Sequence, residues 1–406
     1  MKQMSELLPW KMTDISVYPY GSDLWSMNPS IMRDNTDGTW RCVVRIVDYC
    51  MPNGVTIRSK KAGPGHQTRN AMLILDPKTW KPIQIFKMEE RDDHPRVTCP
   101  NIGYEDMRVF RTDRGGLQGI AASLHLKRDS RSAAGGSSHQ PPEQVLLSFD
   151  AEYNIVTARP IRGDGFSGAP QKNWVPFDHC LEPRFLYSID KGTMFDDRGP
   201  VHSDAAVARA STNAPPVLAI LPFQQAPPPT KPPDSSPVPA APSAKPPRTL
   251  IRSSTEAQLV RGRRVMVDAA ATRPTGTTRY RGARSGGDAS RSLGTGRVLL
   301  PKYEGLRGGT QLVRVGEDAW LGIGHEMKFV DARKFYWHVW YLVDSKGKMV
   351  AASEPCKLAP EGIEFAAGMA IEGDRVVVSF GVDDMYARLG ETQLSAVMGI
   401  LRPVER

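Results

Sequence analysis

Short runs of β-branched and aromatic residues recur along the chain, and turn-forming residues separate them. They read WRCVVRIVDY (residues 40–49), AMLILD (71–76), LQGIAASLHL (117–126), QVLLSFD (144–150), RFLYSID (184–190), AWLGIGHE (319–326), YWHVWYLVD (336–344) and RVVVSFGVDD (375–384). Such runs are typical of β-strands. Helical periodicity is scarce, and no helix longer than about ten residues is predicted. The pattern therefore predicts a mostly β protein.

Five segments share one plan, in which an apolar strand, a turn and a second apolar strand end on a polar residue. They span residues 28–48, 105–125, 172–190, 309–325 and 365–384. Further strand pairs lie between them, so each unit has room for four strands. Repeated four-stranded units are typical of a β-propeller, whose inner strands converge on a central axis. We therefore predict an all-β fold, a five-bladed β-propeller. A β-sandwich or two unrelated β domains are the alternatives.

A Pro-rich break interrupts this pattern. Residues 227–247 read PPPTKPPDSSPVPAAPSAKPP, and the stretch that follows is rich in Arg, Gly, Ser and Thr. Proline lacks the backbone N–H and fixes φ, which disfavours both a helix and a strand ladder. We predict a disordered insert over residues 224–295 that loops out of the third blade. Residues 1–223 would form blades 1–3, with 217–223 as an outer strand, and residues 296–406 would form blades 4–5 of the same domain.

The formal net charge is +9, but much of the basic excess lies between Arg248 and Arg297. Arg-Gly stretches there can contact nucleic-acid phosphates. A solvated linker is the favoured interpretation, so we expect no nucleic-acid partner outside the insert. The five cysteines are widely spaced and form no CxxC pair, which favours reduced thiols in a cytoplasmic protein. No signal peptide or apolar membrane span is predicted, and no motif for a cofactor or metal occurs.

Polar residues near the strand ends of different units are the candidates for chemistry. They are Asn28, Arg45, Asp48, Glu105, Asp106, Arg108, Lys172, Asn173, Asp190, His325, Glu326, Asp383 and Asp384. Carboxylates suit acid/base catalysis, and Lys, Arg and His suit an anionic group. Structural alternatives exist. Asp48 and Asp190 can form turns, and His325 can be a hydrogen-bonded core residue. Arg108 can simply neutralise Asp106.

Four short motifs, in order along the chain, resemble those of the five-bladed propellers that act on β-mannosides. That family comprises β-mannoside phosphorylases, hydrolases and related mannosyltransferases. Residues 104–108 (YEDMR) resemble its (E/Y)DPR signature, and 172–177 (KNWVPF) resemble its KN..LFP strand. Residues 321–325 (LGIGH) resemble its apolar strand that ends in His, and 381–384 (GVDD) resemble its GAAD motif. The motifs span most of the chain outside the insert.

The resemblance implies a mechanism and a set of roles. Asp106 would be the general acid, which protonates the glycosidic oxygen through a sugar hydroxyl. Lys172 and His325 would bind the phosphate that attacks the anomeric carbon with inversion, and Arg108 is a further candidate. The sugar would be bound by Asn28, Arg45, Asp48, Glu105, Arg108, Asn173, Asp190, Asp383 and Asp384.

Two positions depart from the family's pattern. Met107 replaces the signature proline, and Ser188 lies approximately where the family has an arginine that binds phosphate. Three alternatives to a phosphorylase therefore stay open. One is a transferase that uses a sugar phosphate, and another is a non-catalytic glycan-binding propeller. The third is an inverting hydrolase, which needs a second carboxylate, Glu326 or Asp383, about 6.5–9.5 Å from the acid. The expected partner is a glycan or a sugar phosphate.

Overall fold

The computed structural model describes residues that precede and follow the Pro-rich segment in the sequence. It describes residues 2–52, 55–59, 66–93, 102–114, 116–124, 142–161, 173–189, 192–196, 199–200, 303, 305–330, 333–360 and 362–404. The chain divides into two units, of which the first comprises Met1–Ile220 with Arg297–Arg406 and the second Leu221–Gly296. All described residues belong to the first unit. The predicted insert at 224–295 and the predicted outer strand at 217–223 lie outside the described residues.

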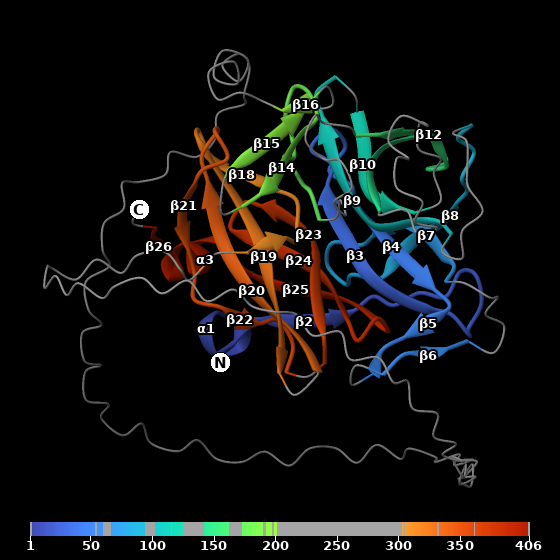
Figure 1. The fold of residues 1–406 in the computed structure, drawn as a ribbon, viewed down its shortest axis with the longest axis horizontal. Coiled ribbons are helices and arrows are strands. Elements are labelled where there is room, and N and C mark those ends of the chain that lie inside the picture. Colours follow the sequence, from blue (N-terminus) through green and yellow to red (C-terminus); the bar gives the residue numbers. More distant parts are fainter. Residues whose placement is uncertain are drawn as a thin grey trace, which may run out of the picture. The chain divides into compact units, whose positions relative to one another are not determined.

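The first unit is mostly β, as predicted, and four of its sheets have four antiparallel strands each (Figure 1). The first sheet contains β3 (Trp25–Arg33), β4 (Trp40–Val47), β7 (Thr68–Leu75) and β8 (Pro82–Met88). The second contains β9 (Tyr104–Thr112), β10 (Gly116–Ser123), β11 (Glu143–Phe149) and β12 (Ile155–Pro160). The third contains β13 (Val175–Pro176), β14 (Arg184–Ser188), β15 (Thr193–Asp196) and β16 (Gly199–Pro200). The last contains β23 (Glu364–Glu372), β24 (Arg375–Val382), β25 (Tyr386–Gln393) and β2 (Lys11–Asp14).

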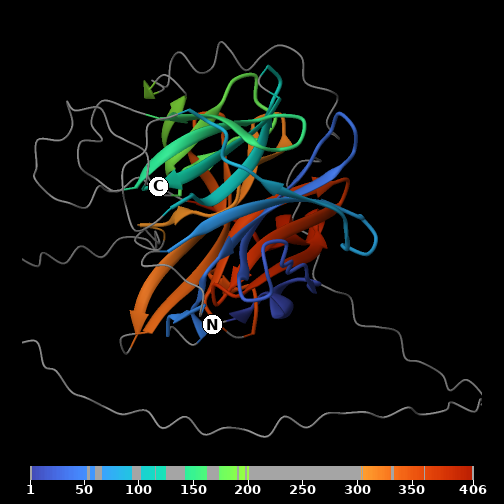
Figure 2. The ribbon, with the colours of Figure 1, turned by 90° about the vertical axis from the view of Figure 1, so that its right-hand side faces the viewer.

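An eight-stranded sheet lies between the third and the last sheet in chain order. It is built on β19 (Ala319–Val330) and β20 (Arg333–Val343), a long hairpin that extends away from the sheet in Figure 2. Its other strands are β17 (Arg307–Gly308), β18 (Val313–Gly316), β21 (Met349–Ala352), β22 (Cys356–Lys357), β1 (Lys2–Gln3) and β26 (Arg402–Pro403). A small separate ribbon pairs β5 (Tyr49–Cys50) with β6 (Ile57–Arg58). The two described helices are short, α1 (Met4–Leu7) and α3 (Leu394–Ile400).

Neighbouring sheets pack face to face and form a propeller-like arrangement. Each core cluster combines side chains from two sheets, because alternate residues of a strand point to opposite faces. Along β9, for example, Val109 packs against the first sheet, whereas Phe110 packs against Trp174 and Phe185 of the third. Further clusters join the third sheet to the eight-stranded sheet, the eight-stranded sheet to the last, and the last to the first.

The N-terminal segment completes two sheets that are otherwise built from the C-terminal part of the chain. Strand β2 pairs with β25 from Lys11↔Glu391 to Asp14↔Arg388, and β1 pairs with β22. Trp10 lies between them, where its indole N–H donates to the carbonyl of Leu358 at 3.0 Å. A side chain at Gly390 would collide with the Trp10 ring, so the close approach requires glycine there. The chain ends are therefore tied into the same β structure.

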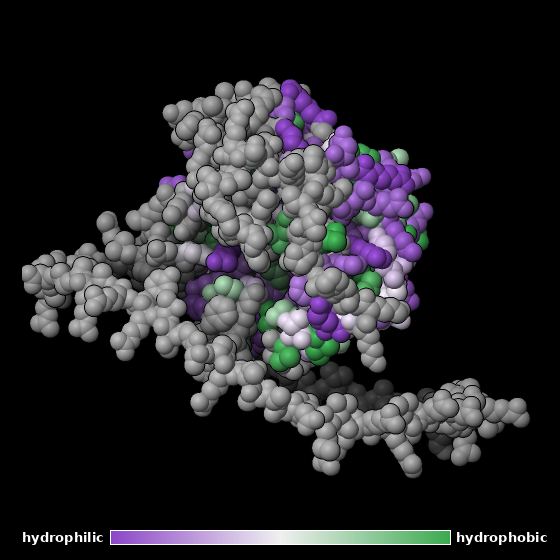
Figure 3. All heavy atoms as spheres, turned by 45° about the vertical axis from the view of Figure 1, so that its right-hand side comes forward, coloured by the Kyte–Doolittle hydropathy of each residue, from purple (hydrophilic) through white to green (hydrophobic). Residues whose placement is uncertain are grey.

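Exposed apolar side chains are scattered over the outer strands. Ile83 and Ile85 lie on β8, and Val156 lies on β12. The face shown in Figure 3 has hydrophobic residues among mostly hydrophilic ones in its described part. Isolated exposed apolar residues are normal on protein surfaces.

Candidate functional site

The innermost strands carry β-bulges at the positions where the sequence motifs place polar residues. The register of β3 against β4 shifts between Met27 and Ser30, and that of β9 against β10 shifts at Asp106 and Met107. Asn28, Asp106 and Asn173 all have left-handed backbones, with φ of 43°, 50° and 65°. Asn and Asp tolerate this region better than most residues. Because a bulge re-aims side chains and is frequent beside active sites, it gives the first and second sheets a comparable way to direct a polar group, and Asn173 shares the left-handed backbone just before β13 of the third.

Asp106 is the centre of the contacts that these bulges create. Its Oδ1 accepts a hydrogen bond from Asn28 Nδ2 at 2.8 Å and one from Arg45 Nη1, also at 2.8 Å. The neighbouring Glu105 lies 3.4 Å from Arg45 Nη2 through its Oε1. Gly381 of β24 allows this approach, because a Cβ there would lie 2.2 Å from Asn28 Oδ1. Residues from the first and second sheets therefore meet at one carboxylate, and the last sheet packs against Asn28 beside it.

Arg45 is almost completely buried, and protein groups surround its guanidinium. Nε and Nη2 both donate to Thr68 Oγ1, at 3.2 and 3.0 Å, and Nη2 lies 3.4 Å from the Tyr49 hydroxyl. Burial alone lowers the pKa of Arg45, but Glu105, Tyr49, Asp106 and Asp384 outweigh that effect and raise it above its usual value. Arg45 is therefore a fixed positive charge.

Arg108 is also buried, and it joins three parts of the site. Its Nε donates to the carbonyl of Gly309, Nη1 to the carbonyl of Asp106 at 3.2 Å, and Nη2 to Asn173 Oδ1 at 3.2 Å. Its guanidinium also lies 5.6 Å from the centre of the Phe365 ring. Burial lowers the pKa of Arg108 to about 10, although Asp106 opposes the shift. These contacts make Arg108 a strut between the second, third and eight-stranded sheets.

Three rings form the side of the site next to Arg108. The buried His325 of β19 lies 5.1 Å from Tyr336 of β20 and 5.1 Å from Phe365 of β23, measured between ring centres. Both contacts are edge to face, the geometry that aromatic rings favour. His325 therefore contacts Phe365, the ring that packs on Arg108.

Three other predicted residues hold local structure. Asp48 Oδ1 accepts a hydrogen bond from the Gln67 N–H at 3.2 Å, which ties a loop of the first sheet. Asp383 Oδ1 accepts one from the Ile363 N–H at 2.8 Å. Glu326 lies 3.0 Å from Lys328 on the β19–β20 hairpin. The described contacts do not connect Asp383 or Glu326 to Asp106. Asp384 interacts with Arg45 electrostatically.

Two predicted site residues, Lys172 and Asp190, lie outside the described residues. Sequence reasoning in turn missed Thr68, Tyr49 and Phe365. Thr68 and Phe365 belong to no recognisable sequence motif. Tyr49 ends the apolar run at residues 40–49, where it resembles an ordinary strand residue. Only the pairing of β4 with β7, which sets Val47 opposite Thr68, brings the threonine near Arg45.

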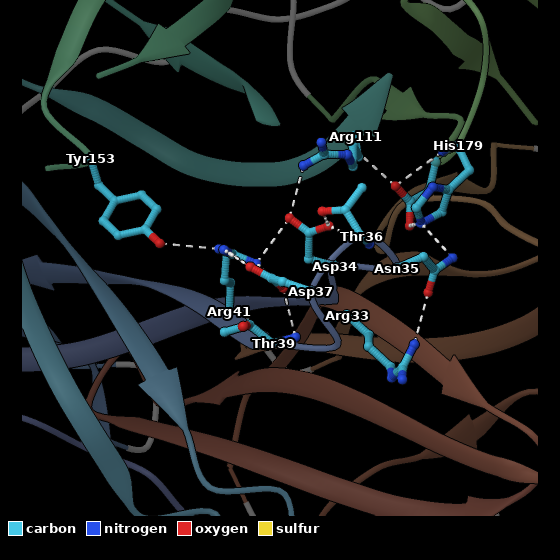
Figure 4. A network of polar contacts seen from close by, with 11 residues as sticks. Arg33, Asp34, Asn35, Thr36, Asp37, Thr39, Arg41, Arg111, Tyr153 and His179 are labelled. Carbon is cyan, nitrogen blue, oxygen red and sulfur yellow. Dashed lines mark hydrogen bonds and ion pairs between the residues drawn. The ribbon is translucent and has the colours of Figure 1, made fainter. Parts of the chain in front are cut away.

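A second polar network lies toward the C-terminal ends of β3 and β9 (Figure 4). Asp34, in the β3–β4 turn, pairs with Arg41 at 2.9 Å and with Arg111 at 2.8 Å. Asn35 of the same turn lies 3.1 Å from His179, which follows β13. The turn thus ties the first sheet to the second and third. Its charges are balanced within the network, so we interpret it as structural.

No group of three or more His, Cys, Asp or Glu suited to a metal ion occurs in the part of the chain that the structure describes. Within that same part, no helix has the length and apolar character that a membrane span needs.

Comparisons with known proteins identify similar structures but no matching sequence. No protein-family description matches the chain, and no curated protein matches it. A glycosyl hydrolase from Bacteroides ovatus has a TM-score of 0.47 and 11% identity, over 94% of this chain and 86% of that one. A β-1,2-mannobiose phosphorylase from Listeria innocua has a TM-score of 0.44 and 10% identity, over 95% of both chains. A mannose phosphorylase from Leishmania mexicana has a TM-score of 0.40 and 10% identity, over 97% of this chain and 92% of that one.

Proposed function

We propose that the first unit is one five-bladed propeller, in which the eight-stranded sheet is the fourth blade. The support is the cyclic order of the core clusters, which join each sheet to the next and the last sheet to the first. Strand β2 would close the ring by completing the last blade. Residues before and after the insert would then share one central site, with residues 1–223 and 296–406 as parts of one domain.

We propose that this site acts on carbohydrate, as an inverting glycoside phosphorylase or glycosyltransferase for β-mannoside-type glycans. The observation that carries the proposal is Asp106 on its bulge, held by Asn28 and Arg45. The ordered motifs around it add support. A carboxyl group that is held in place by two donors can be presented to a sugar in one orientation, which is a requirement of general acid catalysis.

In the proposed reaction, Asp106 gives a proton through a sugar hydroxyl to the glycosidic oxygen. The bond between the anomeric carbon and that oxygen breaks, and the oxygen leaves as a hydroxyl. Phosphate forms the new bond through an ionised oxygen from the opposite face and so inverts the configuration. In the reverse, transferase direction, the hydroxyl of an acceptor glycan attacks the anomeric carbon of a sugar 1-phosphate, phosphate leaves, and the proton of that hydroxyl passes through the sugar hydroxyl to the Asp106 carboxylate. Lys172 and His325 are the proposed phosphate ligands. Arg108 serves as a strut, because its guanidinium already donates to three protein oxygens.

A glycan-binding protein without catalysis is the second candidate, and one contact favours it. The 2.8 Å ion pair with Arg45 stabilises the ionised form of Asp106. A carboxylate accepts hydrogen bonds from sugar hydroxyls but has no proton to give. In the transferase direction this carboxylate would accept the proton of the acceptor, whereas phosphorolysis requires that substrate binding bring a proton to Asp106.

Substitution of Asp106 separates the two candidates. Wild type, Asp106→Asn and Asp93→Asn, an exposed control, would be incubated with mannose 1-phosphate plus a panel of acceptor sugars, and with β-mannosides plus phosphate. An enzyme gives product with wild type and Asp93→Asn and loses at least about a hundredfold in Asp106→Asn. Full activity of Asp106→Asn contradicts the assigned role. Calorimetric binding of β-mannosides without any product supports the binding protein.

A further inference from the structure

Thr68 holds Arg45 from the side opposite Asp106. Its single hydroxyl oxygen accepts from both Nε and Nη2 of Arg45, and the side chain is almost fully buried. The backbone of Thr68 is itself held, because its N–H donates to the carbonyl of Ile102 at 2.9 Å. Gly103 lies against that backbone, where a Cβ would come within 2.1 Å of the Thr68 carbonyl oxygen. The hydroxyl is therefore a fixed acceptor.

Two carboxylates lie beside the guanidinium of Arg45, each next to a different nitrogen. Nη1 of Arg45 lies 2.8 Å from Asp106 Oδ1, whereas Nη2 lies 3.4 Å from Glu105 Oε1. The guanidinium is planar and rigid, so an acceptor that fixes Nε and Nη2 also fixes the direction of Nη1. With Thr68 as that acceptor, the shorter contact falls on Asp106, although Glu105 has the larger electrostatic effect on Arg45.

We propose that Thr68 is a positioning residue, whose hydroxyl orients Arg45 so that its Nη1 points at Asp106. It thereby sets the charge state of the carboxyl group in the proposed general acid. This inference rests on the proposed function only where it calls Asp106 the general acid. The expected effect of Thr68 on the Asp106 carboxyl group requires no substrate.

Among the described residues, the charged groups near Asp106 come from neighbouring strands and turns. Arg45 approaches from β4 and Glu105 precedes Asp106 on β9. Arg108, on the same strand, interacts with Asp106 electrostatically. Asp384, which follows β24, and Tyr49 of β5 act on Arg45. A substitution of Thr68 removes none of these charged groups, so it tests the orientation of Arg45 rather than the charge around Asp106.

The test is a pH titration of Asp106 by carbon NMR in protein labelled at the aspartate carboxyl carbons, with the signal assigned from Asp106→Asn. Thr68→Val keeps the shape and β-branching but removes the acceptor, and Thr68→Ser keeps the hydroxyl. We expect the titration midpoint of Asp106 to rise by about one pH unit in Thr68→Val, because a loosened Arg45 stabilises the carboxylate less. In Thr68→Ser it should stay within about 0.3 units of wild type.

Two results would overturn the proposal. One is an unchanged midpoint in a folded Thr68→Val protein, and the other is an equal rise in Thr68→Ser and Thr68→Val. If Thr68→Val does not fold, Thr68→Ala supplies the same comparison. Because the titration uses no ligand, its outcome is independent of turnover. A protein in which Asp106→Asn has full activity can still show the Thr68 effect, so failure of the proposed function and failure of this inference are distinguishable.

Discussion

The side-chain amide of Gln311 pairs with the backbone of Met369 as another strand residue would. Its Nε2 donates to the Met369 carbonyl at 2.6 Å, and its Oε1 accepts from the Met369 N–H at 3.1 Å. The same Nε2 donates to the carbonyl of Ile31 on β3 at 2.7 Å. Gln311 is completely buried. One side chain from the connection between β17 and β18 therefore joins the inner strands of the last and first sheets.

Replacing Gln311 with Ala should lower the free energy of unfolding by about 3 kcal/mol, because three buried backbone groups lose a partner. Urea denaturation followed by tryptophan fluorescence measures this. Gln84→Ala, on the exposed face of β8, is the matched control and should change stability by less than about 0.5 kcal/mol. A loss below about 1 kcal/mol for Gln311→Ala would show that water or a shifted backbone replaces the lost bonds.

Glu391 joins the last sheet to the turn after β7. Its Oε1 accepts from the Trp80 indole at 2.6 Å, and its Oε2 accepts from Arg375 Nε and Nη2 at 2.9 and 2.5 Å. Glu391→Gln removes the charge from all three bonds, so we expect a loss of about 2 kcal/mol in urea denaturation.

The pair Arg33–Glu372 provides the contrast for that prediction. It has a similar distance, 2.8 Å, but its glutamate side chain is 43% exposed, against 15% for Glu391. Glu372→Gln should therefore cost about 0–1 kcal/mol. Equal losses in the two variants would mean that burial does not strengthen the Glu391 contacts.

Glu364 makes stability fall as the pH rises. Burial raises the pKa of Glu364 from 4.5 to about 7, although the Leu358 N–H and Lys357 oppose the shift. The folded state thus holds this proton more tightly than the unfolded state does, so its contribution is complete below pH 4.5 and is lost as the pH rises through 7. Glu364→Gln, which cannot ionise, should be more stable than wild type by about 2 kcal/mol at pH 8.

Urea denaturation at pH 5 and pH 8 would test this difference. The exposed Glu6→Gln variant should follow wild type at both values. A Glu364→Gln protein that is less stable than wild type at pH 8 would mean that the ion pair with Lys357, at 3.4 Å, outweighs the cost of burial.

His338 should make stability fall in the acid direction. Its Nε2 accepts a hydrogen bond from the Ala366 N–H at 3.3 Å, which requires a neutral ring with its proton on Nδ1. Burial, and then Lys357, lower the pKa of His338 to about 3. The folded state binds this proton less tightly, so stability is lost as the pH falls from 6.5 toward 3.

His338→Gln removes that titration. Between pH 6.5 and pH 4, wild type should lose about 2–3 kcal/mol more than this variant. His66→Gln, at a half-exposed histidine, is the control and should behave as wild type does. The measurement is thermal unfolding across this pH range. Parallel pH profiles for wild type and His338→Gln would contradict the assigned role.

The strands of this protein were predictable because their signal is local. Runs such as residues 40–49 and 375–384 became β4 and β24, since alternating apolar residues can be buried on both faces of a packed sheet. Three of the five predicted unit starts, at residues 28, 105 and 365, fell in the strands β3, β9 and β23 for the same reason. Strand β2 was not predictable. Its partner β25 is remote in sequence, and four residues carry too little pattern to identify a pairing.

The site also has features that the sequence predicted and features that it could not predict. The chain itself determined that Asn28, Asp106 and Asn173 stand near the starts of successive repeated units, because repetition is visible in one dimension. Only the tertiary structure decided which of them touch. It set Asn28 and Arg45 on one oxygen of Asp106 and turned Arg108 into a strut between sheets. Bulges and the packing of neighbouring sheets fix those contacts, and neither has a signature in the spacing of residues along the chain.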